Sequence, residues 1–166
     1  MKRANLFLLF LIVVLLSGCT GTNDVTMASL LDKEFKELEL GLEGRIPVNG
    51  TNRISDKGKI KSFARLFNGI TVQEIEDEYY RLKEEERSGQ SSISAYLLTS
   101  ADESGKDGYN IKFFEDGTVL VIEMTDFVGT GFYIAEEKSS PLYQDVREFY
   151  EANVTFEGGN VLDQLE

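Results

Sequence analysis

Carboxylate and aromatic side chains are the groups of this chain that could do chemistry, because its 166 residues include no histidine, no tryptophan and one cysteine. The lack of histidine excludes Ser-His-Asp and Cys-His catalysis and imidazole metal ligands. A single cysteine can form neither an internal disulfide nor a multi-cysteine metal site. The sequence has no phosphate-binding or dinucleotide-binding glycine motif, and no S-x-x-K motif of a Ser-Lys enzyme. We therefore expect no catalytic residue, no metal and no cofactor.

Acidic residues gather in one loop and in two trios, and each group is a candidate site. In the loop 101–108, counting a calcium loop from Asp102 puts Lys106 at a ligand position and leaves the required sixth-position glycine missing. We expect a solvated connection there. The trios 76–78 and 84–86 would splay by 100° per residue on a helix, so they indicate a solvent-facing surface. A carboxylate pair can hydrolyse glycosides without histidine, which keeps a small carboxylate-dependent hydrolase as an alternative.

Two pairs of adjacent aromatic residues are the remaining candidates for binding. Tyr79 and Tyr80 lie in a segment with helical periodicity, and Phe132 and Tyr133 follow a glycine-rich turn. At least one ring of each pair should face outward, where exposed rings can bind sugars, peptides or partner proteins. The alternative is ordinary packing in the interior. These four residues are the predicted interaction surface.

The N-terminal segment predicts export from the cytoplasm. Lys2 and Arg3 precede an unbroken apolar run of 11 residues, Leu6 to Leu16. A mature membrane-spanning helix needs about 20 apolar residues, whereas a run of this length is typical of a signal peptide. Residues 1–18 are therefore predicted to be a signal peptide that is removed.

The sequence Leu16-Ser17-Gly18-Cys19, at the end of this run, resembles the lipobox of bacterial lipoproteins. The resemblance implies that the Cys19 thiol receives diacylglycerol and that a signal peptidase cuts between Gly18 and Cys19. Two acyl chains give stable attachment, so it also implies a protein held on the outer face of the cell membrane. The acidic, cysteine-poor body looks like the small lipoproteins of Gram-positive bacteria, which favours a Gram-positive source.

The charge of the chain indicates which partners it would attract. The net charge is −12, and removing residues 1–18 would take away Lys2 and Arg3 and no acid, giving −14. Such a body repels nucleic acid and favours a partner protein with a basic face. The sequence therefore predicts a membrane-anchored binding module at the cell surface. The alternatives are an inhibitory or immunity-type lipoprotein that blocks a protease, toxin or phage, and the hydrolase above.

The elements that must position these residues form one domain. We expect a lipidated tether at 19–25, a domain at 26–153 and a loosely held tail at 154–166. Helices are expected at 26–37, after a Ser55 cap as far as Asn68-Gly69, at 72–87 after a Thr71/Glu74 capping box, and after a Ser140 cap with Pro141 in the first turn. Strands are expected at 93–99, 109–114, 118–124 and 132–136, and residues 38–42 alternate like a strand.

Asp116-Gly117 predicts a two-residue hairpin turn between two of these strands. That turn would pair Phe113 with Leu120 and Ile111 with Ile122. The core face would then carry Tyr109, Ile111, Phe113, Leu120, Ile122 and Met124, and the half-polar face Asn110, Lys112, Phe114, Val119, Val121 and Glu123. The predicted fold class is α+β: an antiparallel β-meander of four or five strands with helices packed on one face.

Overall fold

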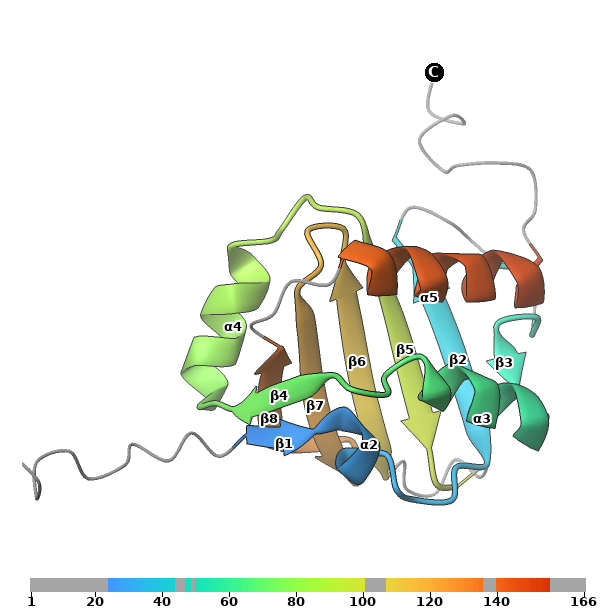
Figure 1. Ribbon diagram of the computed structural model, residues 1–166, viewed down its shortest axis with the longest axis horizontal. Coiled ribbons are helices and arrows are strands. Elements are labelled where there is room, and N and C mark those ends of the chain that lie inside the picture. Colours follow the sequence, from blue (N-terminus) through green and yellow to red (C-terminus); the bar gives the residue numbers. More distant parts are fainter. Residues whose placement is uncertain (1–23, 44–46, 49, 101–106, 136–139, 156–166) are drawn as a thin grey trace, which may run out of the picture.

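The computed structural model describes residues 24–43, 47–48, 50–100, 107–135 and 140–155, and its strands form one antiparallel sheet (Figure 1). The strand order is β1-β4-β8-β7-β6-β5-β2-β3. The strands are β1 (Asp24–Thr26), β2 (Glu37–Leu42), β3 (Arg53–Ile54), β4 (Thr71–Glu74), β5 (Ser92–Leu98), β6 (Gly108–Phe114), β7 (Val119–Thr125) and β8 (Val128–Ala135). The helices are α2 (Met27–Leu30), α3 (Lys57–Arg65), α4 (Asp77–Glu85) and α5 (Ser140–Asn153).

The predicted α+β class and the antiparallel meander are confirmed. The four consecutive strands β5 to β8 are neighbours in the sheet, with β2 and β3 added beside β5 and β4 and β1 beside β8. The predicted number of four or five strands is wrong, because the described residues form eight. The extra strands β1, β3 and β4 have two to four residues each, too few for a period-2 pattern to be recognised.

The predicted helix 72–87 is wrong in its first turn. Thr71–Glu74 is strand β4, which pairs with β1 and β8, and the helix begins only at Asp77. Val72 is buried in the core from this strand. The Thr71/Glu74 spacing that resembles a capping box is also compatible with an extended strand, and pairing on both sides decides between them.

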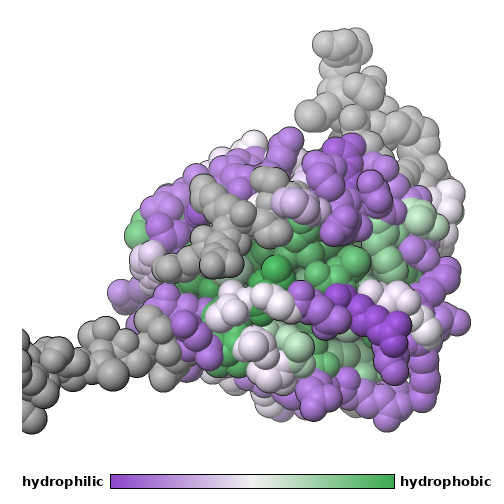
Figure 2. Space-filling view, in the orientation of Figure 1, coloured by the Kyte–Doolittle hydropathy of each residue, from purple (hydrophilic) through white to green (hydrophobic). Residues whose placement is uncertain are grey.

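The prediction that all helices pack on one face is also wrong. Helices α2, α3 and α5 bury their apolar sides in the main core, and α3 and α5 cross in front of the sheet in Figure 1. Figure 2 shows hydrophobic residues between these elements and hydrophilic residues around them. Helix α4 contributes instead to a separate apolar cluster on the other side, which we call the outer face. The sheet is therefore covered on both faces over part of its width.

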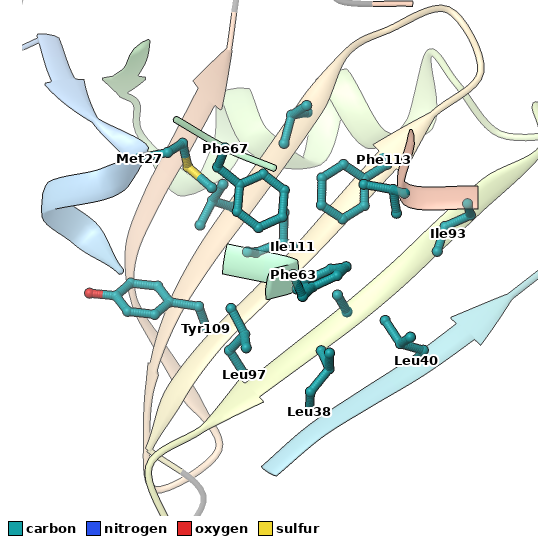
Figure 3. Packing of buried hydrophobic residues seen from close by; sticks show 14 of the residues in the cluster. Met27, Leu38, Leu40, Phe63, Phe67, Ile93, Leu97, Tyr109, Ile111 and Phe113 are labelled. Carbon is teal, nitrogen blue, oxygen red and sulfur yellow. The ribbon is translucent and has the colours of Figure 1, made fainter. Parts of the chain in front are cut away.

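Phe63 of α3 lies at the centre of the main core (Figure 3). Its ring makes edge contacts with Phe67 and Phe113, with centroids 5.2 and 6.4 Å away, and a tilted contact with Phe149 at 5.1 Å. The N-cap of helix α3 is Asp56, one residue after the predicted Ser55 cap. Its Oδ1 accepts the Lys59 N–H at 2.8 Å.

The β6–β7 turn corrects the predicted pairing. Phe114 N–H donates to Thr118 O, and Gly117 has φ +85°. These features describe a three-residue loop with glycine in the left-handed position, rather than a two-residue turn. The extra loop residue pairs Phe113 with Val119 and shifts every residue of β7 to the opposite face. Val119 and Val121 therefore face the main core, and Leu120, Ile122 and Met124 lie on the outer face.

This register also places Glu123 on the main-core side, at its margin. Its Oε1 accepts hydrogen bonds from Lys33 Nζ at 2.9 Å and from the Tyr109 hydroxyl at 3.2 Å. The hydrogen bond to Glu123, followed by the interaction of Lys33 with Tyr109, raises the pKa of Lys33, so the ammonium stays charged. The ion pair with Lys33 and the hydrogen bond from the Tyr109 hydroxyl offset the free-energy cost of placing the Glu123 carboxylate at the margin of the core.

Val121→Thr tests the register directly. Val121 is fully buried, so the near-isosteric threonine would place a hydroxyl in the apolar core, and we expect a loss of about 1–3 kcal/mol in the free energy of unfolding. Val128→Thr, on the exposed part of β8, is the matched control and should change stability by less than about 0.5 kcal/mol. Urea unfolding measures both, and equally small effects would support the two-residue turn instead.

The domain extends beyond both predicted boundaries. Asp24 and Val25, predicted as tether, belong to β1, and Val154, predicted as tail, is buried. Val48 N–H also donates to Thr155 O at 2.7 Å. The lipobox, residues 101–106 of the Asp102 loop and residues 156–166 lie outside the described residues. Among the residues that are described, no helix has the length and apolar character needed to cross a membrane.

Candidate ligand-binding groove

The four aromatic residues predicted as an interaction surface have different environments. Tyr79 is exposed. Tyr80 is only 3% exposed and packs against Phe132, with ring centroids 5.5 Å apart. Burial, followed by the charge of Glu84, raises the pKa of the Tyr80 phenol. Tyr133 is buried on the main-core side. One ring of each pair therefore faces outward, since Tyr79 is exposed and the half-buried Phe132 lines a groove, whereas Tyr80 and Tyr133 are buried.

Helix α4 forms one wall of this groove. Asp77 and Glu78 lie in its first turn, where their negative charges interact favourably with the positive end of the helix dipole. Asp77 also accepts two hydrogen bonds from Arg81 Nε, at 3.0 and 3.1 Å, along the same side of the helix. Tyr80 is the buried residue that fixes α4 to the outer face, where it joins Phe114, Leu120 and Ile134. One helix with one buried ring covers only part of this face.

Beside α4, the uncovered part of the outer face forms two connected hollows that we call the outer groove. The larger has a volume of about 670 Å³ and the smaller about 220 Å³, and they share Tyr96, Met124 and Phe127. The lining residues are Glu39, Asp77, Tyr80, Arg81, Glu84, Tyr96, Leu98, Asn110, Ile122, Met124, Phe127, Val128, Gly129 and Phe132. The larger volume lies in the range of ligand sites in proteins, and the mixture of apolar and few polar groups is typical of them.

The β7–β8 turn carries the most exposed apolar side chains of the groove. Phe127 is 60% exposed and Val128 is 63% exposed. Asp126 and Phe127 both have positive φ, +51° and +66°. A hairpin turn with two such residues normally contains asparagine and glycine, and a phenylalanine there is strained. The Asp126 N–H donates to Asp107 Oδ1 at 3.0 Å, which helps to hold the turn. Strain of this kind is found at ligand-binding positions.

Phe127→Gly should raise the free energy of unfolding by about 1 kcal/mol, because glycine adopts this φ without strain and the ring it removes is 60% exposed. Phe127→Ala is the matched control, since it removes the ring but retains the strained φ. Thermal and urea unfolding would compare the two. Equal stability of the glycine and alanine variants would show that the turn is unstrained.

Polar groups of the groove are held in place from its sides. Glu84 Oε1 accepts from Lys112 Nζ at 3.0 Å, and Glu39 Oε2 lies 3.5 Å from Arg53 Nε. In the floor, the Asn110 side-chain oxygen is buried and has no hydrogen-bond partner among the described residues. An unsatisfied buried acceptor costs about 1–3 kcal/mol of stability. The Asn110 oxygen is therefore a polar group that does not contribute to the stability of the domain.

A second, acidic hollow continues from the groove at the start of α4, and we call it the acidic notch. It has a volume of about 550 Å³ and is lined by Glu74, Ile75, Glu76, Asp77, Thr130, Gly131 and Phe132. In the part of the chain that the structure describes, no three histidine, cysteine or acidic side chains are arranged to hold a metal ion. The notch therefore concentrates negative charge without forming a metal site there.

Two described carboxyl groups outside the groove have lowered pKa values. Hydrogen bonds from Lys57 and Lys36 lower the pKa of Glu34 to about 2, and a hydrogen bond from Lys83 lowers the pKa of Glu86. A glycosidase acid needs a raised pKa, so neither Glu34 nor Glu86 has the shift that such an acid requires.

Sequence reasoning missed Tyr96, Asn110 and Phe127 as groove residues. The alternation Ser94-Tyr96 in β5 could have indicated an outward ring, and Phe127 follows an acidic residue between two strands, where a turn exposes its side chain. Their convergence depends on the register of β5, β6 and β7, in which Tyr96 pairs with Asn110 and Asn110 with Ile122.

Comparison with models of protein families, with curated proteins and with solved structures finds no match for this chain. The fold and the groove therefore define the class of protein by their own features: an α+β domain with an open, partly apolar groove on the outer face of its sheet.

Proposed function

We propose that this protein is a lipid-anchored extracytoplasmic binding protein that holds its ligand in the outer groove. The observation that carries the binding role is the strained Asp126-Phe127 turn, which presents an exposed ring at a groove already lined by Tyr96 and Met124. An exposed apolar ring held in a strained turn beside a hollow is typical of a binding position. The anchor is supported by the apolar run of residues 6–16 and by the lipobox ending at Cys19.

The proposal is tested by crosslinking in the cell that makes the protein. The full chain is produced with a photo-reactive phenylalanine analogue in place of Tyr96, and in a second version in place of Lys61, which is exposed on α3 of the opposite face. We expect a discrete adduct from position 96 and none from position 61. Adding Phe127→Gly should weaken the adduct, because the change removes one side of the groove. Equal adducts from both positions, or none from position 96, would contradict the proposal.

A further inference from the structure

We infer that the outer groove and the acidic notch together bind a linear segment of a partner protein that combines apolar and basic side chains. This inference rests on the proposed function and specifies its ligand class. It follows from three properties of the described residues: the continuity of the hollows, the chemistry of the floor and the charge of the walls.

The hollows form one track across the sheet. The notch and the larger hollow share Asp77 and Phe132, and the larger and smaller hollows share Tyr96, Met124 and Phe127. The track crosses β8, β7, β6, β5 and β2, along the row Phe132–Ile122–Asn110–Tyr96–Glu39. Five neighbouring strands span about 19 Å, the length of about six extended residues. The shape therefore suits a linear segment better than a compact small molecule.

The floor of the track offers anchoring contacts for apolar side chains. Ile122, Met124 and Phe132 are half-buried, and Tyr96 and Phe127 are exposed rings at its margin. Aromatic residues and methionine are the types that dominate binding surfaces, because they supply a large contact area at low conformational cost. Asn110 adds an acceptor without a partner in the described structure. A peptide main chain or a basic side chain carries the N–H donors that such an oxygen requires.

The walls of the track are predominantly acidic. Its lining includes five carboxylates, Glu39, Glu74, Glu76, Asp77 and Glu84, and one basic side chain, Arg81. Arg81 is already paired with Asp77, and within the described chain no cation lies at ion-pair distance from Glu74 or Glu76. With a net charge of −12 on the chain, the field at the track attracts cations and repels phosphate-rich partners. Basic side chains of a partner would complement the two unpaired carboxylates at the notch.

The test measures binding of two labelled peptides of about eight residues to the purified full chain in detergent. In one peptide, lysine alternates with leucine and phenylalanine, and in the other glutamate replaces every lysine. We expect the lysine peptide to bind at least about tenfold more tightly, with the advantage decreasing as salt rises from about 0.05 to about 0.5 M. Fluorescence anisotropy reports both affinities.

Variants separate the apolar and charged contributions. Tyr96→Ser and Phe127→Gly should each weaken the lysine peptide by about tenfold at any salt. Glu74→Gln with Glu76→Gln should weaken it mainly at low salt. The matched controls are Leu82→Ser, an exposed apolar residue of α4 outside the groove, and Glu148→Gln, an exposed carboxylate of α5. Both controls should leave the affinity unchanged.

Equal binding of the two peptides would overturn the inference, as would equal losses in the groove variants and the controls. Binding of vesicles that contain phosphatidylglycerol, or of a neutral oligosaccharide, with no binding of the lysine peptide would overturn it in favour of a lipid or a glycan. If Tyr96 gives its adduct in the cell but the full chain does not prefer the lysine peptide, the inferred ligand class is wrong and the proposed binding function stands.

Discussion

Phe63→Ala is expected to lower the free energy of unfolding by about 3–5 kcal/mol, the range for truncating a buried phenylalanine. The Phe63 side chain has no solvent exposure and contacts three other rings, Phe67, Phe113 and Phe149. Removing it leaves a cavity between α3, α5 and the sheet that rigid strands cannot fill. Urea unfolding followed by far-UV circular dichroism measures the change.

Lys61→Ala is the control for this substitution, because Lys61 lies on the same helix and is exposed. It should change stability by less than about 0.5 kcal/mol. A loss of less than about 1 kcal/mol for Phe63→Ala would mean that α3 does not pack on the sheet as described. Since the domain from β1 to Thr155 contains no cysteine, both values should be the same with and without reductant.

Much of the fold could be predicted from hydrophobic periodicity. The helix expected between Ser55 and Asn68-Gly69 is present as α3, and the strands of the meander were predicted within a few residues, apart from the N-terminal half of β8. Long amphipathic segments carry this information locally. The short strands β1, β3 and β4 could not be found in the same way, because their state depends on pairing with residues distant in sequence, such as Val25 with Val72.

One residue in the β6–β7 turn accounts for the main error in the predicted core. Asp-Gly favours a two-residue turn, but Asp116 Oδ1 accepts from Thr118 N–H at 2.9 Å, and Gly117 takes the left-handed position of a three-residue loop. Both sets of alternate residues in β7 are largely apolar, so the sequence alone could not distinguish the two registers. The register in turn determines which residues of β7 lie on the outer face and line the groove.

The candidate groove depends still more on tertiary structure than the core does. Tyr79 and Tyr80 have the same local sequence signal, yet one is exposed and the other is buried under Phe132. The groove exists because α4 covers the outer face incompletely, and no local pattern specifies how far a helix extends over a sheet. Only the charge of the walls followed from composition.

Cys19→Ala is expected to have the largest effect on the protein in its cell. Without the thiol, no diacylglycerol can be attached, and the lipoprotein signal peptidase should not cut after Gly18. The protein would then remain as a precursor that retains residues 1–18 and carries no lipid. Intact mass, labelling with a fatty-acid analogue and membrane fractionation would measure the change. Finding the wild-type chain unlipidated would contradict the proposed location.

The same substitution separates location from binding when it is compared with Phe127→Gly. The glycine variant retains Cys19 and should remain on the membrane, while its groove loses an exposed ring and the affinity that depends on it. The alanine variant at position 19 retains the groove but would lack the two acyl chains that the proposed location requires. If the protein acts on a membrane-proximal partner, each change alone should abolish the activity of the wild type. A Cys19→Ala protein that still forms the Tyr96 adduct would show that binding does not depend on the anchor.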